Sequence, residues 1–257
     1  MKLNQIAFQL YTCKPVIKTP AELAKTLRRV RAIGYTGVEV CCTPEGMTAA
    51  EISQMLADEG LICCSTHESS NEILANPQKI IDRQQALSCT NTAYPYPSDV
   101  DLTDPESVCG LIAKLQAAGT LMRQAGITLC YHNHAHEFRK LNGKTILEQI
   151  YEGTTPEALQ GELDTYWVHN GGGDVVEWCE KLAGRLPVIH LKDYSVNNQN
   201  TPQYCEIGSG NLNFKKIIAA AEAAGCKWFI VEQDVCPGDP VDSLEQSFRY
   251  IQSNLAE

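Results

Sequence analysis

Side chains that can bind metals or move protons gather at the ends of short apolar runs spread along the whole sequence. Five of the six histidines belong to this set, together with several carboxylates and one lysine. The set comprises Gln9, Tyr11, Glu39, His67, His132, His134, His136, Glu137, Asp164, His190, Lys192, Asp193, Glu232 and Asp234. A single polar residue after a strand is usually structural, since it caps a helix or satisfies a buried group. So many such residues at the ends of apolar runs indicate a catalytic or ligand-binding site.

Charge indicates which chemistry this set could perform. Three carboxylates and one imidazole carry about −3, which is too repulsive to bury without a compensating cation. Such a donor set suits Mn²⁺ or Mg²⁺ better than metals that prefer thiolates. His132, His134 and His136 alternate, so an extended chain would place all three on one face and allow a three-histidine zinc site. We rank that site lower, because the spacing of His134 and Glu137 suits a chain that bends out of its strand.

The elements that must position these side chains alternate between strand-like and helix-like segments. Thr19 with Glu22, and Thr48 with Glu51, predict helix starts closed by capping boxes. Eight strand–helix units of roughly 30 residues predict an α/β fold, a (β/α)₈ TIM barrel that forms one domain over residues 1–257. An open doubly wound sheet is the alternative, but no G-x-G-x-x-G follows the first strand. The predicted strands are residues 5–10, 37–41, 61–65, 89–94, 127–132, 159–163, 187–191 and 227–231.

Composition excludes several classes of function. The 31 acidic residues outnumber the 21 basic ones, which gives a formal net charge of −10. This balance argues against nucleic-acid binding and against docking on anionic membranes. No apolar run approaches the ~20 residues of a membrane span. The twelve cysteines include no C-x-x-C pair and the N-terminus shows no secretory pattern, so we expect reduced thiols and a cytoplasmic location.

Several motifs resemble those of the sugar phosphate isomerase/epimerase family, the xylose isomerase-like TIM barrels. The two most specific are YHNHAHEF at residues 131–138 and LDTYW at residues 163–167. QLYT at 9–12, GYTGVE at 34–39, HLKD at 190–193, GSGNL at 208–212 and VE at 231–232 complete a series that covers essentially the whole chain. The segment 131–138 differs from that of the ketose epimerases, in which the metal-binding glutamate lies deeper in the strand.

The resemblance implies one divalent metal ion, Mn²⁺ above all, with Mg²⁺, Co²⁺ or Zn²⁺ as alternatives. Carried over position by position, the ligands are Glu137, Asp164, His190 and Glu232. His134 matches a residue proposed as a base in related members, and Glu137 and Glu232 join it as predicted catalytic residues. The predicted substrate-binding residues are Gln9, Glu39, His67, His132, Trp167 and Lys192.

These roles imply a sugar isomerase or epimerase. A base would remove the proton beside the carbonyl of a keto-sugar or cyclitol, and the metal would stabilise the enediolate. The same enolate could expel a leaving group, so a keto-sugar lyase or inosose-type dehydratase is the nearest alternative. An AP endonuclease-like hydrolase, which needs several zinc ions and a basic rim, and a non-catalytic sugar-binding barrel are more distant. We expect a small-molecule sugar or cyclitol as partner, no nucleic acid or membrane, and leave a homo-oligomer open.

Overall fold

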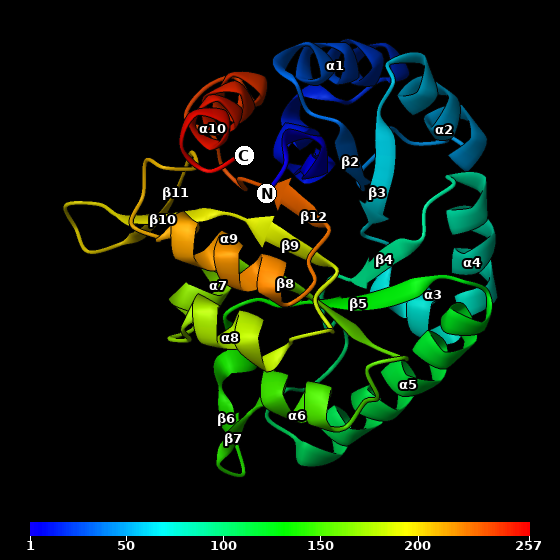
Figure 1. Cartoon of the computed structure of the whole chain (residues 1–257). Coiled ribbons are helices and arrows are strands. Elements are labelled where there is room, and N and C mark those ends of the chain that lie inside the picture. Colours follow the sequence, from blue (N-terminus) through cyan, green and yellow to red (C-terminus); the bar gives the residue numbers. More distant parts are fainter.

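The computed structural model describes residues 1–257 and confirms the (β/α)₈ barrel (Figure 1). Eight parallel strands form one sheet in the order β3-β2-β1-β12-β9-β8-β5-β4. A bridge between His67 and Ala93 joins the two edge strands, so the sheet is nearly closed. In chain order the strands are β1 Ile6–Gln9, β2 Gly37–Val40, β3 Ile62–Thr66, β4 Asn91–Tyr94, β5 Thr128–His132, β8 Gln160–Asp164, β9 Val188–Leu191 and β12 Trp228–Val231. Each lies in one of the eight predicted runs or overlaps it.

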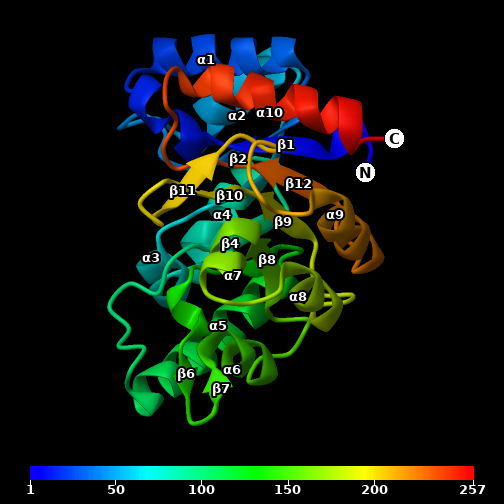
Figure 2. The same ribbon diagram turned by 90° about the vertical axis from the view of Figure 1, so that its left-hand side faces the viewer.

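Helices surround the sheet, as Figures 1 and 2 show from two directions. They are α1 Pro20–Ile33, α2 Ala49–Asp58, α3 Ser70–Ala75, α4 Pro77–Ala86, α5 Pro105–Gln124, α6 Ile146–Glu152, α7 Thr165–Asn170, α8 Val175–Lys181, α9 Phe214–Ala223 and α10 Pro240–Asn254. Two small hairpins, β6 Lys140–Leu141 with β7 Lys144–Thr145 and β10 Asp193–Val196 with β11 Pro202–Cys205, interrupt the pattern. The last helix packs against the first, and the termini meet where the Glu257 N–H donates to the Met1 carbonyl at 3.0 Å.

Local signals fix the helix ends. Both predicted capping boxes are confirmed: Thr19 caps α1 and Thr48 caps α2, each through reciprocal bonds with the acid three residues later. Gly34 ends α1 with a φ of +130°, and a Cβ there would lie 2.6 Å from the Phe248 ring. Glycine is thus required by both the backbone and the packing of α1 against α10.

The barrel interior is built in layers, with an apolar layer directly below the polar one. Six small or branched side chains form a separate buried cluster: Ala7, Cys64, Ala93, Cys130, Val188 and Ile230. Successive side chains of a strand point to opposite faces, so the residue two positions later shares the same face. Five of these positions lead to polar side chains, and four of the five belong to the candidate site, namely Gln9, His132, His190 and Glu232. The strand period therefore places the candidate site on the apolar floor of the barrel, at its carboxyl end.

All twelve cysteines are free thiols, as the sequence predicts. No helix of the chain combines the length and the apolarity needed to cross a lipid bilayer.

Two glycines of α5 provide a direct test of the packing around the barrel. A Cβ at Gly119 would lie 1.8 Å from the Ala158 carbonyl oxygen, whereas a Cβ at Gly110 meets nothing within 4 Å. We expect Gly119→Ala to lower the free energy of unfolding by roughly 1–3 kcal/mol, because the helix must move away from the 158 backbone. Gly110→Ala, the matched control, should raise it by roughly 1 kcal/mol. Urea unfolding measures both, and a stabilised Gly119→Ala would contradict the packing.

Candidate active site

Four buried side chains converge at the carboxyl end of the barrel. One donor atom from each of His132, Asp164, His190 and Glu232 lies within 4.8 Å of the others. They come from the ends of β5, β8 and β9 and from the residue after β12. A second group of this kind contains His67, His132, Glu162 and His190, so the two groups share a pair of histidines. The fold therefore brings together three of the four predicted ligands, Asp164, His190 and Glu232.

Glu137 does not join the three other predicted ligands. It belongs to a separate group with His134 and His136, in the 3-10 helix His136–Phe138 that follows β5. Its carboxylate accepts a hydrogen bond from the Tyr131 hydroxyl at 3.0 Å and another from the His134 N–H at 2.8 Å. The fourth donor is instead His132, which is still inside the strand. The sequence comparison already pointed to a ligand inside the strand, because the metal-binding glutamate of the ketose epimerases also lies deeper in that strand.

His190 is the hub of the site, because each of its ring nitrogens faces a pair of carboxylates. Nδ1 lies 2.9 Å from Glu232 Oε2 and 3.9 Å from Asp164 Oδ2. Nε2 lies 2.6 Å from Glu39 Oε2 and 3.3 Å from Glu162 Oε1. A carboxylate behind a histidine fixes the orientation and the proton of the ring.

Two predicted substrate-binding residues lie behind this hub instead of facing solvent. Gln9 and Glu39 are fully buried, and Gln9 Nε2 donates to Glu39 Oε2 at 2.5 Å. Neither residue lines the cavity described below. Their contacts suit them to orienting His190. Glu162, which sequence reasoning missed, faces the same Nε2 atom of His190 as Glu39 does, and its Oε1 also lies 2.5 Å from His67 Nε2. Its signal was a charged residue inside a predicted strand, two positions before Asp164 and so on the same face of that strand.

Lys192 supplies the one permanent cation of the site. Its side chain is buried, and Nζ lies 3.0 Å from Glu232, 3.4 Å from Asp164 and 2.6 Å from Asp234. It also lies 5.4 Å from the centre of the Trp167 ring. Three carboxylates thus hold the ammonium group in place. The Trp167 ring contacts the site through this ammonium group.

Burial and charge together set the protonation of these groups. Burial opposes a charged imidazole, yet the carboxylates of Glu39 and Glu162 raise the pKa of His67 to about 9. Burial and the charge of Glu39 raise the pKa of Glu162 to about 7. Burial raises the pKa of Asp164 to about 6, even though Lys192 favours its charged form. The cluster therefore holds extra protons near neutral pH, which offset its excess of buried negative charge.

The two histidines of the YHNH segment behave in the opposite way. Burial and the neighbouring His190 hold the pKa of His132 well below its ordinary value. Burial lowers the pKa of His134 to about 4. Both rings are therefore neutral at pH 7, which is the form that binds metals or accepts protons.

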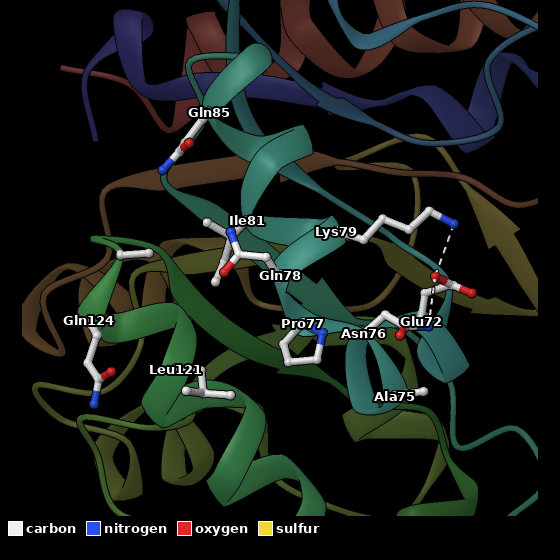
Figure 3. Close-up of a pocket in the computed structure, with 11 residues that line it drawn as sticks. Glu72, Ala75, Asn76, Pro77, Gln78, Lys79, Ile81, Gln85, Leu121 and Gln124 are labelled. Atoms are coloured by element: carbon white, nitrogen blue, oxygen red, sulfur yellow. Dashed lines mark hydrogen bonds and ion pairs between the residues drawn. The ribbon is translucent and has the colours of Figure 1, made fainter.

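A cavity of about 450 Å³ opens onto this cluster. Its lining includes His67, His132, His134, Lys192, Glu232 and Asp234. A groove of about 870 Å³ on the outside of the barrel is larger, but it lies between α3, α4 and α5 (Figure 3). That groove holds the exposed Glu72–Lys79 ion pair and no histidine or cysteine. The inner cavity is therefore the candidate active site.

Comparison with known proteins agrees with this geometry. The profile of the xylose isomerase-like TIM barrel family matches residues 27–254. The chain belongs to that family. A sugar phosphate isomerase/epimerase from Parabacteroides distasonis has the same fold, with a TM-score of 0.84 and 22% identity over 97% of this chain and 94% of that one.

Two further similar proteins are informative. An inosose dehydratase from Geobacillus thermodenitrificans is 25% identical over 158 residues, which are 55% of this chain and 52% of that protein. The chain thus spans about half the length of that curated relative. A xylose isomerase-like TIM barrel protein from Mycobacterium smegmatis, solved in complex with magnesium, is 18% identical with a TM-score of 0.70, and the match covers 100% of both chains.

The donor set of this family barrel fits a divalent metal ion. Two imidazoles and two carboxylates are ligands that first-row divalent ions accept. Asp164 Oδ1 accepts a hydrogen bond from the Trp167 N–H, whereas the buried Asp164 Oδ2 accepts no hydrogen bond and has only the Lys192 ammonium at 3.4 Å and the His190 ring at 3.9 Å near it. A buried carboxylate oxygen that accepts no hydrogen bond can still coordinate a metal ion.

The GSGNL motif of the family resemblance has a structural role here. Asp193 Oδ2 accepts hydrogen bonds from the N–H groups of Gly208 and Gly210, both at 2.9 Å. Oδ1 accepts from Tyr194 at 2.8 Å and from Leu212 at 3.2 Å. A Cβ at Gly210 would lie 2.4 Å from Asp193 Oδ1, which explains the glycine. Asp193 therefore anchors the loop that returns from the β10–β11 hairpin, next to Lys192.

An amide at position 193 tests this anchor. Asparagine offers one acceptor oxygen, so Asp193→Asn leaves two N–H donors facing an NH₂ group. We expect the free energy of unfolding to fall by roughly 3 kcal/mol. Asp174→Asn is the matched control, since Asp174 only caps α8 and asparagine caps as well as aspartate. A loss below roughly 1 kcal/mol for Asp193→Asn in urea unfolding would contradict the assignment.

Proposed function

We propose that the protein is a metal-dependent sugar isomerase or epimerase that removes a proton beside the carbonyl of a keto-sugar or cyclitol. The observation that carries this proposal is the four-donor group of His132, Asp164, His190 and Glu232, of which His132 and Glu232 line the inner cavity. Two proton-handling side chains, His134 and Lys192, line the same cavity. The family, and the isomerase/epimerase name of its Parabacteroides member, support the same class of reaction.

We propose that these four residues hold one divalent ion, with Mn²⁺ favoured. His132 takes the place that the sequence resemblance gave to Glu137. Such an ion acts as a Lewis acid that polarises a carbonyl and stabilises negative charge on its oxygen. Mixed imidazole and carboxylate donors accept Mn²⁺ without thiolates, and the nearby cysteines are absent from the group.

His134 is the best candidate for the base. Its ring is neutral at pH 7, lines the cavity, and its buried Nδ1 has no hydrogen-bond partner. The ring is held against Trp167, with centres 5.3 Å apart. Glu232 is less suited, because Lys192 and His190 both hold its pKa below the ordinary value against the effect of burial. Lys192 stays cationic beside the reacting atoms and supports the negative charge that develops on the substrate.

A dehydratase is the second candidate, and the name of the curated relatives favours it. Removal of the same proton, followed by departure of a hydroxyl group from the next carbon, releases one water molecule. An isomerase or epimerase instead returns the proton and keeps the mass of the substrate. The two candidates therefore share the first step and differ in the product.

Metal content tests the ligand set. We expect the purified protein to contain about one divalent ion per chain, mainly manganese, by inductively coupled plasma mass spectrometry. Asp164→Asn and Glu232→Gln should each lose the ion, because each removes a charged donor of the same size. Glu137→Gln is the matched control and should keep it. Loss of the metal in Glu137→Gln, together with its retention in Asp164→Asn, would refute the ligand set proposed here. It would favour Glu137 as a ligand, as the family resemblance implied.

Proton exchange tests the reaction. The Mn²⁺-loaded protein should catalyse exchange of a carbon-bound proton in D₂O for one member of a panel of keto-sugars and inososes, followed by NMR. We expect His134→Ala to slow this exchange by ~10²–10⁴-fold, which is the usual contribution of a general base. His169→Ala, at a histidine outside the cavity, should leave the rate unchanged.

Two outcomes of the same experiment decide the class. A product lighter by one water identifies a dehydratase, and a product of unchanged mass identifies an isomerase or epimerase. The absence of exchange with every member of the panel would contradict the proposed function.

A further inference from the structure

Only two tyrosine, tryptophan or phenylalanine side chains of this protein are exposed, and both line the cavity of the candidate site. Tyr11 is 38% exposed and Tyr96 is 50% exposed. The remaining aromatic side chains are buried or half-buried. Aromatic side chains that line a cavity supply contact surface for small-molecule ligands.

The two tyrosines stand on separate parts of the cavity mouth. Tyr11 follows β1 and Tyr96 follows β4, and these strands are three places apart around the barrel. The loops after β2 and β3 lie between them in the barrel order, and they contribute Cys42, Glu68 and Ser69 to the lining. The mouth thus combines two aromatic rings with polar groups that can bind hydroxyls.

Tyr96 is held in place in spite of its exposure. Its ring packs edge-on against the rings of His134 and His136, with centres 5.3 and 5.2 Å apart. The Ser70 hydroxyl donates to its backbone carbonyl. Tyr11 is also contacted, since Lys14 Nζ lies 5.0 Å from the centre of its ring. The Tyr96 ring is therefore preorganised, which lowers the entropy lost on binding.

The depth of the cavity separates this surface from the chemistry. Glu232, Lys192 and His132 are buried at its floor, whereas the two tyrosines lie at its exposed mouth. A reacting sugar at the floor leaves the mouth to whatever is attached to it. The cavity of about 450 Å³ falls in the size range of sites that enclose ligands larger than one small ring.

We propose that Tyr11 and Tyr96 form an accessory subsite for a second sugar ring, so that the substrate is a disaccharide or larger glycoside. A pyranose ring presents an apolar C–H face that packs flat on an aromatic side chain, while its hydroxyls reach the polar groups of the mouth. The proposal rests on the proposed function in one respect, the placement of the reacting ring at the cavity floor.

Calorimetric titration with non-reacting sugars tests this subsite. The probes are cellobiose, maltose and sucrose, compared with methyl α- and β-glucoside, on the Mn²⁺-loaded full chain. We expect at least one disaccharide to bind about tenfold more tightly than the matching methyl glucoside. Tyr11→Ala and Tyr96→Ala should each reduce this preference about three- to tenfold and leave the affinity for the methyl glucoside unchanged.

Matched variants exclude trivial effects. Tyr96→Phe keeps the ring and should keep most of the preference. Leu121→Ala removes an exposed apolar side chain on α5, far from the cavity lining, and should change nothing. Equal affinity for one and two rings, or a preference that survives both tyrosine substitutions, would overturn the proposal. Tighter binding of phenyl β-glucoside alone would overturn the assignment of a sugar as the second ring.

The readout separates this proposal from the proposed function. Binding of inert disaccharides requires no proton transfer, so it can succeed where proton exchange fails. Exchange without any preference for two rings would refute the subsite and leave the proposed reaction intact.

Discussion

Four carboxyl groups around the His190 ring are almost completely buried, and the rest of the site depends on compensating their charge. Glu39, Glu162 and Asp164 have no exposed surface, and Glu232 is 5% exposed. Each unpaired buried carboxylate would cost several kcal/mol, so the interior must supply positive charge or protons. Lys192 supplies one charge, His190 contacts all four acids, and burial raises the pKa values of Glu162 and Asp164, which favours their neutral forms. A divalent ion among Asp164, His190 and Glu232 would provide the same compensation.

The geometry of the barrel allows these charges to lie close together in its interior. Strands place every second side chain inward, so small apolar residues such as Cys130 and Ile230 fill the floor and polar residues stand two positions above them. Outside the sheet, the larger apolar cluster between the strands and the helices stabilises the barrel by burying apolar surface. Asp193 and its four N–H donors then fix the loop beside Lys192, so the cation cannot move away from its three acids.

Local signals made most of the frame predictable. Capping at Thr19 and Thr48 and the apolar runs depend on near neighbours, so each of the eight strands could be located from the sequence. Glu137 was misplaced relative to the other donors because the turn after His132 depends on the Tyr131 hydroxyl and the His134 N–H, which no spacing rule encodes. Glu162 was missed because its partners, His67 and His190, are distant in sequence. Gln9 and Glu39 were found as polar strand residues, but their depth behind His190 required the closed sheet.

Anomalous X-ray diffraction at the manganese edge, on crystals grown with Mn²⁺, locates any cation bound inside the barrel. We expect one strong peak enclosed by His132, Asp164, His190 and Glu232, next to the inner cavity. A peak among His134, His136 and Glu137, or no ordered peak within the barrel, would contradict the view that a divalent cation balances this buried charge.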